Sequence, residues 1–456
     1  MSNHSANLEL VAADHRYLWH PFTQMQDWLT EDVPVIVAGD GNFLIDADGN
    51  RYLDGVSSLW CNVHGHRHPA LDAALRQQAD HIAHTTLLGL ASEPSIRLAE
   101  RMIRIAPRGL SRVFYSDAGA TAVEIALKMA WQYWRLRGDE GRTAFASLVE
   151  GYHGDTFGSI SVGYSELFHH PFKPLLFPCH KLTPPHVYRW EQGLPAEEAL
   201  ERAVDDAEAL LSQHGHEIAA LIIEPVVQGA AGMWIQPAGY VRALRELTRR
   251  HQVLLICDEV ATGFGRTGRM FAVEHDDVEP DLLCVGKGIS GGYLPLAATL
   301  ATEEIFSAFL GRYDELKTFF HGHTYTGNAL ACAVAIANLE LFDSDQVLTR
   351  VGHRAAHLKR RLHEWISPLA HVGEVRQQGL MVGIELVEHH SPRRGFSIER
   401  KIPQAIVRAA RRRGVVIRPL GPVMVLMPPL SIREAEIDQL CAATRDAIEE
   451  VTTSTR

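Results

Sequence analysis

The sequence lacks any segment suited to crossing a membrane, because no apolar run approaches the ~20 residues that a spanning helix needs. Residues 1–21 show no basic stretch followed by an apolar one, so we expect no secretory signal. The six cysteines are scattered and form no CxxC pair, which favours reduced thiols over a disulfide framework. We therefore expect a cytoplasmic protein with no membrane partner.

Basic residues are also fewer than acidic residues. The 456 residues include 44 Lys and Arg against 55 Asp and Glu, a formal net charge of −11. Phosphate backbones bind basic surfaces, so this balance argues against nucleic acid as a partner. No repeat or low-complexity tract occurs, and the 46% hydrophobic content is enough for a large core without disulfides or metals.

What the sequence does contain, from about residue 70, is an alternation of continuous apolar runs and segments with helical apolar spacing. Continuous apolar strands separated by helices are typical of a mostly parallel sheet covered on both faces. We predict an α/β fold whose strands include residues 111–116, 144–149, 219–225, 253–257 and 281–286.

The two ends of the chain differ from this central pattern. Residues 1–60 resemble an extended arm with short strands, and an Arg-rich amphipathic helix at 354–366 precedes further strand patterns. We expect an N-terminal arm with part of a small domain, a large domain, and a C-terminal small α+β domain, at residues 1–65, 66–330 and 331–456.

Chemically distinctive residues follow the predicted strands. Asp258 comes directly after one apolar run, and Lys287 follows the next. Gly119 and Ala120 open a helix after a third run, and Tyr152 follows a fourth. In parallel sheets the chemistry lies at the carboxyl ends of the strands, so we expect these residues to meet at one edge.

Each residue has an ordinary structural role, such as a cap or a turn, but together they suit pyridoxal phosphate. A lysine in apolar surroundings loses its charge and forms a Schiff base with the cofactor aldehyde. An acid keeps the ring nitrogen protonated, a helix N-terminus binds the phosphate, and an aromatic ring stacks on the pyridine. These parts are supplied by Lys287, Asp258, Gly119 with Ala120, and Tyr152.

The run LLICDEVATGFGRTGRM, together with PDLLCVGKGISGGYLPLAA at 280–298, resembles the signature of the class III, fold-type I aminotransferases. The resemblance covers nearly the whole chain. It implies a mostly parallel, seven-stranded type of sheet in the large domain, beside the smaller α+β domain. Within the class, the 7,8-diaminononanoate synthases of biotin biosynthesis are similar at 18–25, 54–69, 114–134, 151–163, 321–328 and 417–429.

This resemblance implies a homodimer with shared active sites that converts 8-amino-7-oxononanoate to 7,8-diaminononanoate. It implies catalytic roles for Lys287, Tyr152 and Asp258, with Lys287 moving the proton between substrate and cofactor. The phosphate would be held by Gly119 and Ala120 of one subunit, and by His323 and Thr324 of the other.

The resemblance also implies the residues that bind substrate. Trp60 would form part of an aromatic wall, Tyr152 would face the substrate, and Gly322 would touch it. Arg418 would bind the carboxylate of the long-chain oxo acid, because a guanidinium recognises a carboxylate with paired hydrogen bonds. From the residues alone, the alternative interpretation of Arg418 is a surface arginine on a strand.

Two positions bear on the amino donor. Members that use S-adenosylmethionine have a tyrosine and a tryptophan where this chain has Phe22 and Leu59. Both changes resemble a Bacillus-type branch that uses lysine. The sequence leaves S-adenosylmethionine and lysine open, and the less aromatic pocket favours lysine.

The 25 histidines invite a metal hypothesis, since HGHRH occurs at 64–68 and HGH at 321–323. No HExxH motif accompanies them, and His153, His169 and His170 look isolated from acidic partners. We therefore expect no metal site and interpret most histidines as polar lining of an active site.

Several roles and functions stay open at this stage. Glu224 and Gln228 follow a strand, where they contact the cofactor or substrate or serve the fold alone. Arg266, in GFGRTG, lines the pocket or caps a helix; this loop lacks the dinucleotide-binding pattern. The alternative functions are a broad ω-aminotransferase acting on diamines or ω-amino acids, an aminomutase, and a noncatalytic pyridoxal-binding scaffold.

Overall fold

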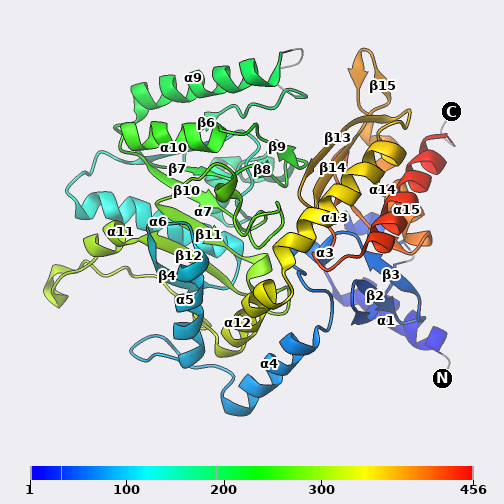
Figure 1. Cartoon of the computed structure of the whole chain (residues 1–456), viewed down its shortest axis with the longest axis horizontal. Coiled ribbons are helices and arrows are strands. Elements are labelled where there is room, and N and C mark those ends of the chain that lie inside the picture. Colours follow the sequence, from blue (N-terminus) through cyan, green and yellow to red (C-terminus); the bar gives the residue numbers. More distant parts are fainter. Residues whose placement is uncertain (1–2, 32, 190–193, 454–456) are drawn as a thin grey trace.

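The computed structural model describes residues 3–31, 33–189 and 194–453, and a seven-stranded sheet lies at its centre (Figure 1). The strand order is β4-β12-β11-β10-β7-β5-β6. β12 is antiparallel to both of its neighbours, and the other neighbouring pairs are parallel. The bounds are β4 (Leu110–Ser116), β5 (Ala144–Leu148), β6 (His180–Leu182), β7 (Ile218–Ile223), β10 (Leu254–Asp258), β11 (Leu282–Val285) and β12 (Ala297–Thr302).

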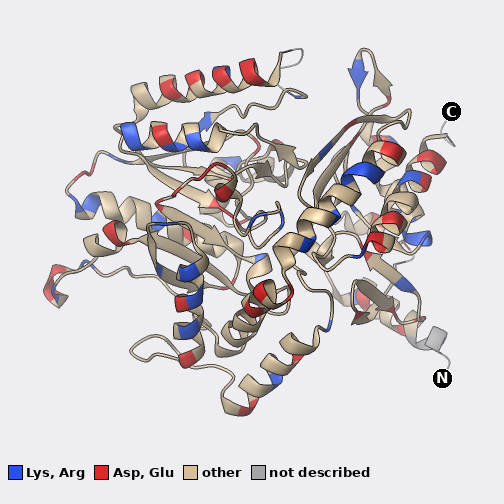
Figure 2. Ribbon diagram, in the orientation of Figure 1, with Lys and Arg blue, Asp and Glu red and all other residues tan. Residues whose placement is uncertain are grey.

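The predicted mostly parallel α/β sheet is confirmed, and its strands are buried on both faces. Leu254 and Ile256 of β10 pack with helix α6 (Gly119–Leu136), whereas Leu255 and Cys257 pack with α9 (Ala196–His214) and α10 (Tyr240–Arg250). Successive side chains of a strand point to opposite faces, so a strand between two helical layers must be apolar throughout. Charged residues lie mainly along the helices (Figure 2).

The chain also forms two four-stranded sheets, the first from segments of both ends of the chain and the second from its C-terminal part. The first has the order β1-β2-β3-β17, with β1 (Ile36–Asp40), β2 (Phe43–Asp46), β3 (Arg51–Asp54) and β17 (Val415–Val416). The second has the order β13-β14-β19-β18, with β13 (Val372–Gln378), β14 (Met381–Leu386), β19 (Val423–Leu426) and β18 (Arg418–Leu420). β17 runs parallel to β3, with Val415 opposite Leu53, so the C-terminal part completes the N-terminal sheet.

The N-terminal segment differs from the predicted extended arm, because Asn3–Tyr17 forms helix α1. Its sequence has Leu, Glu and Ala and no glycine or proline, which favours a helix in the absence of a strand pattern. The extended part begins only at β1. Two short hairpins pair β8 (Val227–Gln228) with β9 (Trp234–Ile235), and β15 (His389–His390) with β16 (Arg393–Arg394).

The other α-helices surround these sheets. They are α2 (Met25–Trp28), α3 (Ser57–Trp60), α4 (Pro69–His81), α5 (Glu93–Ile105), α7 (Phe157–Val162), α8 (Glu166–His169), α11 (Glu303–Ala308), α12 (Ala329–Ser344), α13 (Val347–Arg361), α14 (Ile402–Arg412) and α15 (Glu434–Thr453). Within the described residues, no helix is long and apolar enough to span a bilayer. All six cysteines are free thiols, as predicted.

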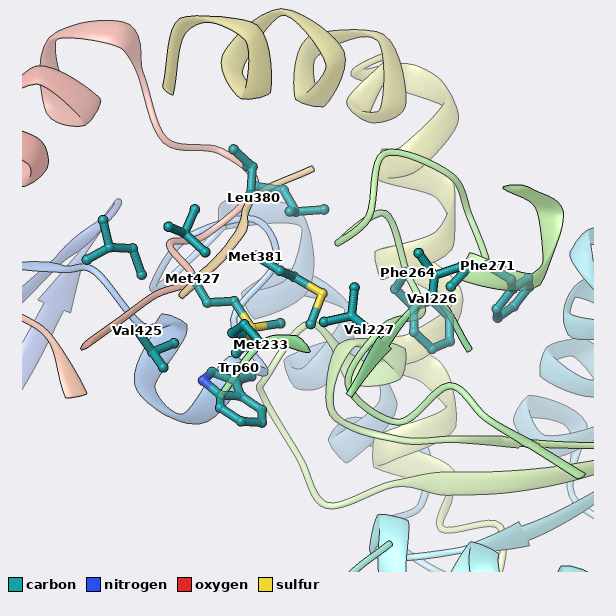
Figure 3. Packing of buried hydrophobic residues seen from close by; sticks show 14 of the residues in the cluster. Trp60, Val226, Val227, Met233, Phe264, Phe271, Leu380, Met381, Val425 and Met427 are labelled. Carbon is teal, nitrogen blue, oxygen red and sulfur yellow. The ribbon is translucent and has the colours of Figure 1, made fainter. Parts of the chain in front are cut away.

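One apolar core joins the large sheet to the C-terminal sheet. Trp60, Met233, Met381 and Met427 lie side by side between Phe264 on one side and the C-terminal strands on the other (Figure 3). The side chains in this cluster are nearly inaccessible to solvent. Burying this much apolar surface fixes the position of Trp60 relative to the strand ends of the large sheet.

Candidate active site

A cavity of about 370 Å³ lies where the carboxyl ends of β5, β7, β10 and β11 meet the first turn of α6. Its lining includes Lys287, Asp258, Tyr152, Gly119 with Ala120, and Trp60. The structure therefore brings together the residues that the sequence placed at strand ends. The lining also includes His153, Gly154, Asp155, Thr156, Glu224, Val260 and Ala261.

Lys287 is the amine of this cavity. It begins the short 3₁₀ turn that follows β11, and its backbone has a positive φ of 43°, a strained conformation for a residue with a side chain. Its Nζ lies 5.1 Å from the ring centroid of Trp60. Burial lowers the pKa of Lys287, which raises the fraction of neutral, nucleophilic amine.

Asp258, the last residue of β10, is held from two sides. His153 donates from Nδ1 to Oδ2 at 2.7 Å, and the backbone N–H of Val260 donates to Oδ1 at 3.0 Å. Both side chains are buried. The Nε2 atom of His153 has no hydrogen-bond partner among the described residues.

The expectation that His153, His169 and His170 lack acidic partners is wrong. His153 contacts Asp258, His169 lies 3.5 Å from Asp155, and His170 lies 2.5 Å from Glu166. The first pair joins residues 105 positions apart, which meet because β5 and β10 end at the same edge. His153 is thus a site residue that the sequence analysis missed, although its place in GYHGD after a strand signals it.

The first turn of α6 opens onto the cavity through Gly119 and Ala120. First-turn N–H groups have no partner within their own helix, and the helix dipole favours an anion there. Gly154 packs directly against this turn with φ at 117°, and a Cβ on it would lie 2.4 Å from the Cβ of Ala120. Only glycine permits this approach, so the turn and its neighbouring loop form a close anion cradle.

Tyr152 and Glu224 form one wall of the cavity. The backbone N–H of Tyr152 donates to Glu224 Oε1 at 3.0 Å, and that of Gly229 donates to Oε2 at 2.8 Å. Burial raises the pKa of Glu224 to about 7. The Tyr152 hydroxyl donates to Asp155 at 2.8 Å, and burial raises the pKa of this phenol. Gln228 instead bonds the Val149 carbonyl at 3.0 Å and does not line the cavity.

The remaining predicted substrate and phosphate residues lie outside this cavity lining. Arg418 is half-buried on β18, 5.9 Å from the Phe22 ring, and burial lowers its pKa. Gly322, His323 and Thr324 lie in the connection to α12, with His323 Nε2 3.8 Å from Asp117. Their predicted contact with a second subunit stays a prediction.

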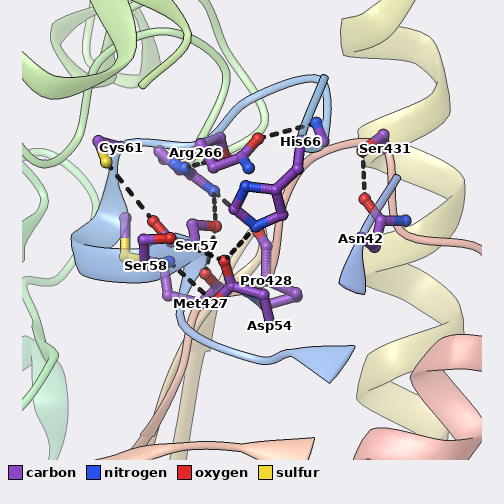
Figure 4. A network of polar contacts seen from close by, with 12 residues as sticks. Asn42, Asp54, Ser57, Ser58, Cys61, His66, Arg266, Met427, Pro428 and Ser431 are labelled. Carbon is purple, nitrogen blue, oxygen red and sulfur yellow. Dashed lines mark hydrogen bonds and ion pairs between the residues drawn. The ribbon is translucent and has the colours of Figure 1, made fainter. Parts of the chain in front are cut away.

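Arg266 neither lines the cavity nor caps a helix. Its guanidinium is fully buried and donates to the carbonyls of Asn62 and Pro428, at 2.7 and 2.8 Å, and to the hydroxyl of Ser57 (Figure 4). It therefore joins the loop after β10 to segments from both ends of the chain. Burial lowers the pKa of Arg266 to about 10.

Comparison with known proteins identifies the family. The family model for aminotransferase class-III matches residues 28–448. The chain belongs to the class-III aminotransferases. An adenosylmethionine-8-amino-7-oxononanoate aminotransferase of Nitratidesulfovibrio vulgaris is 53% identical over 450 residues, covering 98% of this chain and 83% of the relative.

Solved structures of aminotransferases have the same fold. The crystal structure of the adenosylmethionine-8-amino-7-oxononanoate aminotransferase from Methanocaldococcus jannaschii has a TM-score of 0.92 and 45% identity, covering 97% of this chain and 99% of that one. An amine transaminase from an uncultivated Pseudomonas species, in its PLP-bound form, has a TM-score of 0.90 and 38% identity, covering 95% and 98%. The predicted fold type I and the predicted aminotransferase class are confirmed.

Proposed function

We propose that this aminotransferase binds pyridoxal phosphate and transfers an amino group to 8-amino-7-oxononanoate, giving 7,8-diaminononanoate in biotin biosynthesis. The observation that carries the proposal is the 53% identity, across 98% of the chain, to a relative named for this substrate. The same name recurs for a relative from Geobacter sulfurreducens at 48% identity over 441 residues.

The residues of the cavity fit the cofactor. Lys287, the buried Asp258 and the N-terminus of α6 match the aldehyde, the ring nitrogen and the phosphate of pyridoxal phosphate. When bound, the cofactor supplies an aldehyde that accepts an amino group and a ring that withdraws electrons. The helix turn at Gly119 and Ala120 would bind the phosphate.

The residues of this chain would transfer the protons and exclude water from the cavity. The Lys287 amine, whose pKa burial lowers, would take a proton from the reacting carbon of the donor and deliver it to the cofactor, acting in turn as base and acid. Asp258, oriented by His153, would hold the ring nitrogen of the cofactor in its protonated form. Trp60 and Tyr152 wall the cavity and exclude water from it.

Arg418 is our proposed ligand for the carboxylate of the oxo acid. It is half-buried, and its charge acts on Tyr152, so a substrate reaching from the cavity past Tyr152 would meet it. Trp60 and Gly322 are proposed to contact the same substrate. Phe22 and Leu59 are 56% and 46% exposed, which leaves them accessible to a donor.

One experiment tests the reaction and identifies the donor. The holoenzyme is mixed with S-adenosylmethionine, lysine or alanine in parallel, and the absorbance of the bound cofactor is followed through a single turnover. We expect S-adenosylmethionine or lysine to change the spectrum and 8-amino-7-oxononanoate to restore it. Restoration by pyruvate but not by 8-amino-7-oxononanoate would refute the proposal.

A broad amine transaminase is the second candidate function. It is favoured by the similarity to the amine transaminase of the uncultivated Pseudomonas species, at 38% identity and a TM-score of 0.90. Such an enzyme would accept pyruvate readily and would not need Arg418. The higher identity to the 8-amino-7-oxononanoate aminotransferases favours the first candidate.

We also propose a cytoplasmic homodimer with shared active sites. Leu88 and Leu90 are 89% and 62% exposed, and the adjoining loop carries the exposed Phe320 and Tyr325. His84 joins the two loops, donating to the Thr324 carbonyl at 2.8 Å. An apolar surface of this kind marks an interface. The division into 1–65, 66–330 and 331–456 is our proposal for the domains, supported by the separate sheets.

A further inference from the structure

Two histidines and a glutamate meet at the edge of the large sheet opposite the catalytic cavity. His180 begins the edge strand β6, His214 ends helix α9, and Glu217 lies in the turn before β7. The residue after Glu217, Ile218, pairs with Ala144 at the start of β5. The cluster therefore lies at the amino ends of strands whose carboxyl ends form the active site.

The donor atoms of these side chains lie within 4.8 Å of one another. Glu217 Oε1 is 2.7 Å from His214 Nδ1 and 3.4 Å from His180 Nε2, and the two imidazole centroids are 4.5 Å apart. Zinc ligands at about 2.0–2.2 Å from the ion place neighbouring donor atoms roughly 3.4 Å apart in a tetrahedron. The 3.4 Å between Glu217 Oε1 and His180 Nε2 already equals that spacing.

The backbone that carries Glu217 is fixed. Arg142 donates to the carbonyls of Gly215 and Ile218 at 2.9 and 2.8 Å, and its charge is balanced by Asp139 at 2.9 Å. A Cβ at Gly215 would lie 2.4 Å from the Leu211 carbonyl oxygen, so the chain can leave α9 this closely only through glycine. Ordered donor groups lose little freedom when they bind an ion.

The charges around the cluster favour a cation. Acidic residues occupy α9 from its first turn as far as Glu208 (Figure 2). The C-terminal end of that helix, where His214 lies, carries the negative end of the helix dipole. Glu217 adds a carboxylate within hydrogen-bond distance of His214. Side-chain exposures of 27%, 34% and 36% leave a path for an ion.

We propose that His180, His214 and Glu217 bind a divalent metal ion of the zinc class, with water or the neighbouring His216 as the fourth ligand. Neutral imidazole and carboxylate are ligands that Zn²⁺ accepts. The ion takes the place of the proton between His214 and Glu217. It joins the edge strand β6 to the turn between α9 and β7, so it stabilises this edge and takes no part in the chemistry.

Zinc binding to the holoenzyme tests the proposal. The protein is treated with a chelator, dialysed, and titrated with ZnCl₂ by calorimetry, and its metal content is measured by mass spectrometry. We expect about one Zn²⁺ per chain and a rise in the thermal unfolding midpoint. The double variant His180→Ala/His214→Ala should bind Zn²⁺ at least roughly 10-fold more weakly and lose that rise, with unchanged transaminase activity.

A control variant tests whether Zn²⁺ binding needs the histidines of this cluster rather than any nearby histidine. His251 lies beside the same turn, but its imidazole contacts Glu208, at 2.9 Å, and is not part of the cluster, so His251→Ala should bind Zn²⁺ as the wild type does. The conservative Glu217→Gln, which keeps the shape of the turn, should also weaken binding. A wild-type protein that retains no Zn²⁺, or a double variant that binds it equally well, would overturn the proposal.

Discussion

At the scale of single residues, the orientation of the Asp258 carboxylate depends on His153. His153 supplies the only charged or polar side chain that bonds Asp258 Oδ2 among the described residues. We expect His153→Ala to lower kcat roughly 10- to 100-fold, because a misplaced acid no longer matches the ring nitrogen. His153→Asn, whose amide can donate in place of Nδ1, should recover part of the rate.

The measurement is steady-state kinetics together with a pH titration of the absorbance of the bound cofactor. If His153 positions Asp258, the titration of the alanine variant shifts as its rate falls. An unchanged titration with a lower rate would assign His153 a purely structural role.

Lys287 should be indispensable. Lys287→Ala removes the buried amine, so we expect loss of the covalently bound form of the cofactor in absorbance spectra and a loss of turnover of at least about 100-fold. Lys401→Ala, which changes a surface lysine paired with Asp27, is the control and should keep both. Normal turnover in the Lys287 variant would refute the catalytic role of Lys287.

The raised pKa of Glu224 predicts that the stability of the folded protein depends on pH. Its pKa is about 7 in the folded chain against a usual 4.5, so between these values the folded protein binds the extra proton and stability falls as the pH rises. A shift of this size corresponds to on the order of 3 kcal/mol. Relative to the wild type, Glu224→Gln should therefore gain stability between pH 5 and pH 8.

Urea unfolding at both pH values, on the wild type and the variant, checks this. Glu198 is exposed, so the control variant Glu198→Gln should have the same free energy of unfolding as the wild type at both pH values. Equal pH slopes for the wild type and Glu224→Gln would contradict the prediction.

The sequence could predict Asp258 and Lys287 because each directly follows a continuous apolar run, a pattern that locates strand ends. It could not predict the partners of those residues. The pair of His153 and Asp258 depends on which strand ends adjoin, and that is a property of the sheet order rather than of local sequence. For the same reason, the sequence alone could not predict the cluster of His180, His214 and Glu217.

At the scale of elements, the loop after β10 is anchored by Arg266. Arg266→Ala would leave the carbonyls of Asn62 and Pro428 buried without a donor, and we expect a loss of about 3 kcal/mol or more in the free energy of unfolding. The exposed Arg269, in the same loop, is the control, and Arg269→Ala should stay within about 0.5 kcal/mol of the wild type. The midpoint of urea unfolding measures both; equal midpoints would refute the anchoring role.

Element positions were predictable where the pattern was strong. β7, β10 and β11 are continuous apolar runs, and the structure places them as expected. β6 has only three residues, and β12 is rich in alanine and threonine, so neither has a distinctive pattern. The sequence does not predict α1, because no clear apolar period identifies this helix and strand patterns follow it directly.

At the scale of the whole molecule, the exposed loops around Leu88 predict the oligomeric state. Leu88→Glu/Leu90→Glu places two charges in the proposed interface, where desolvating them is costly. We expect light scattering to give a dimer for the wild type and a monomer for this variant. Ile398→Glu, at a distant site that is 80% exposed, should remain a dimer. A monomeric wild type would exclude shared active sites.

The parallel pairing of β17 with β3 has a consequence for how the protein is made. Until residue 415 leaves the ribosome, β3 has an open edge and the N-terminal sheet is incomplete. Exposed strand edges in partly synthesised chains invite misassembly. The order of translation therefore delays completion of the small sheets until nearly the whole chain is made, and the central sheet, whose strands end at residue 302, can assemble first.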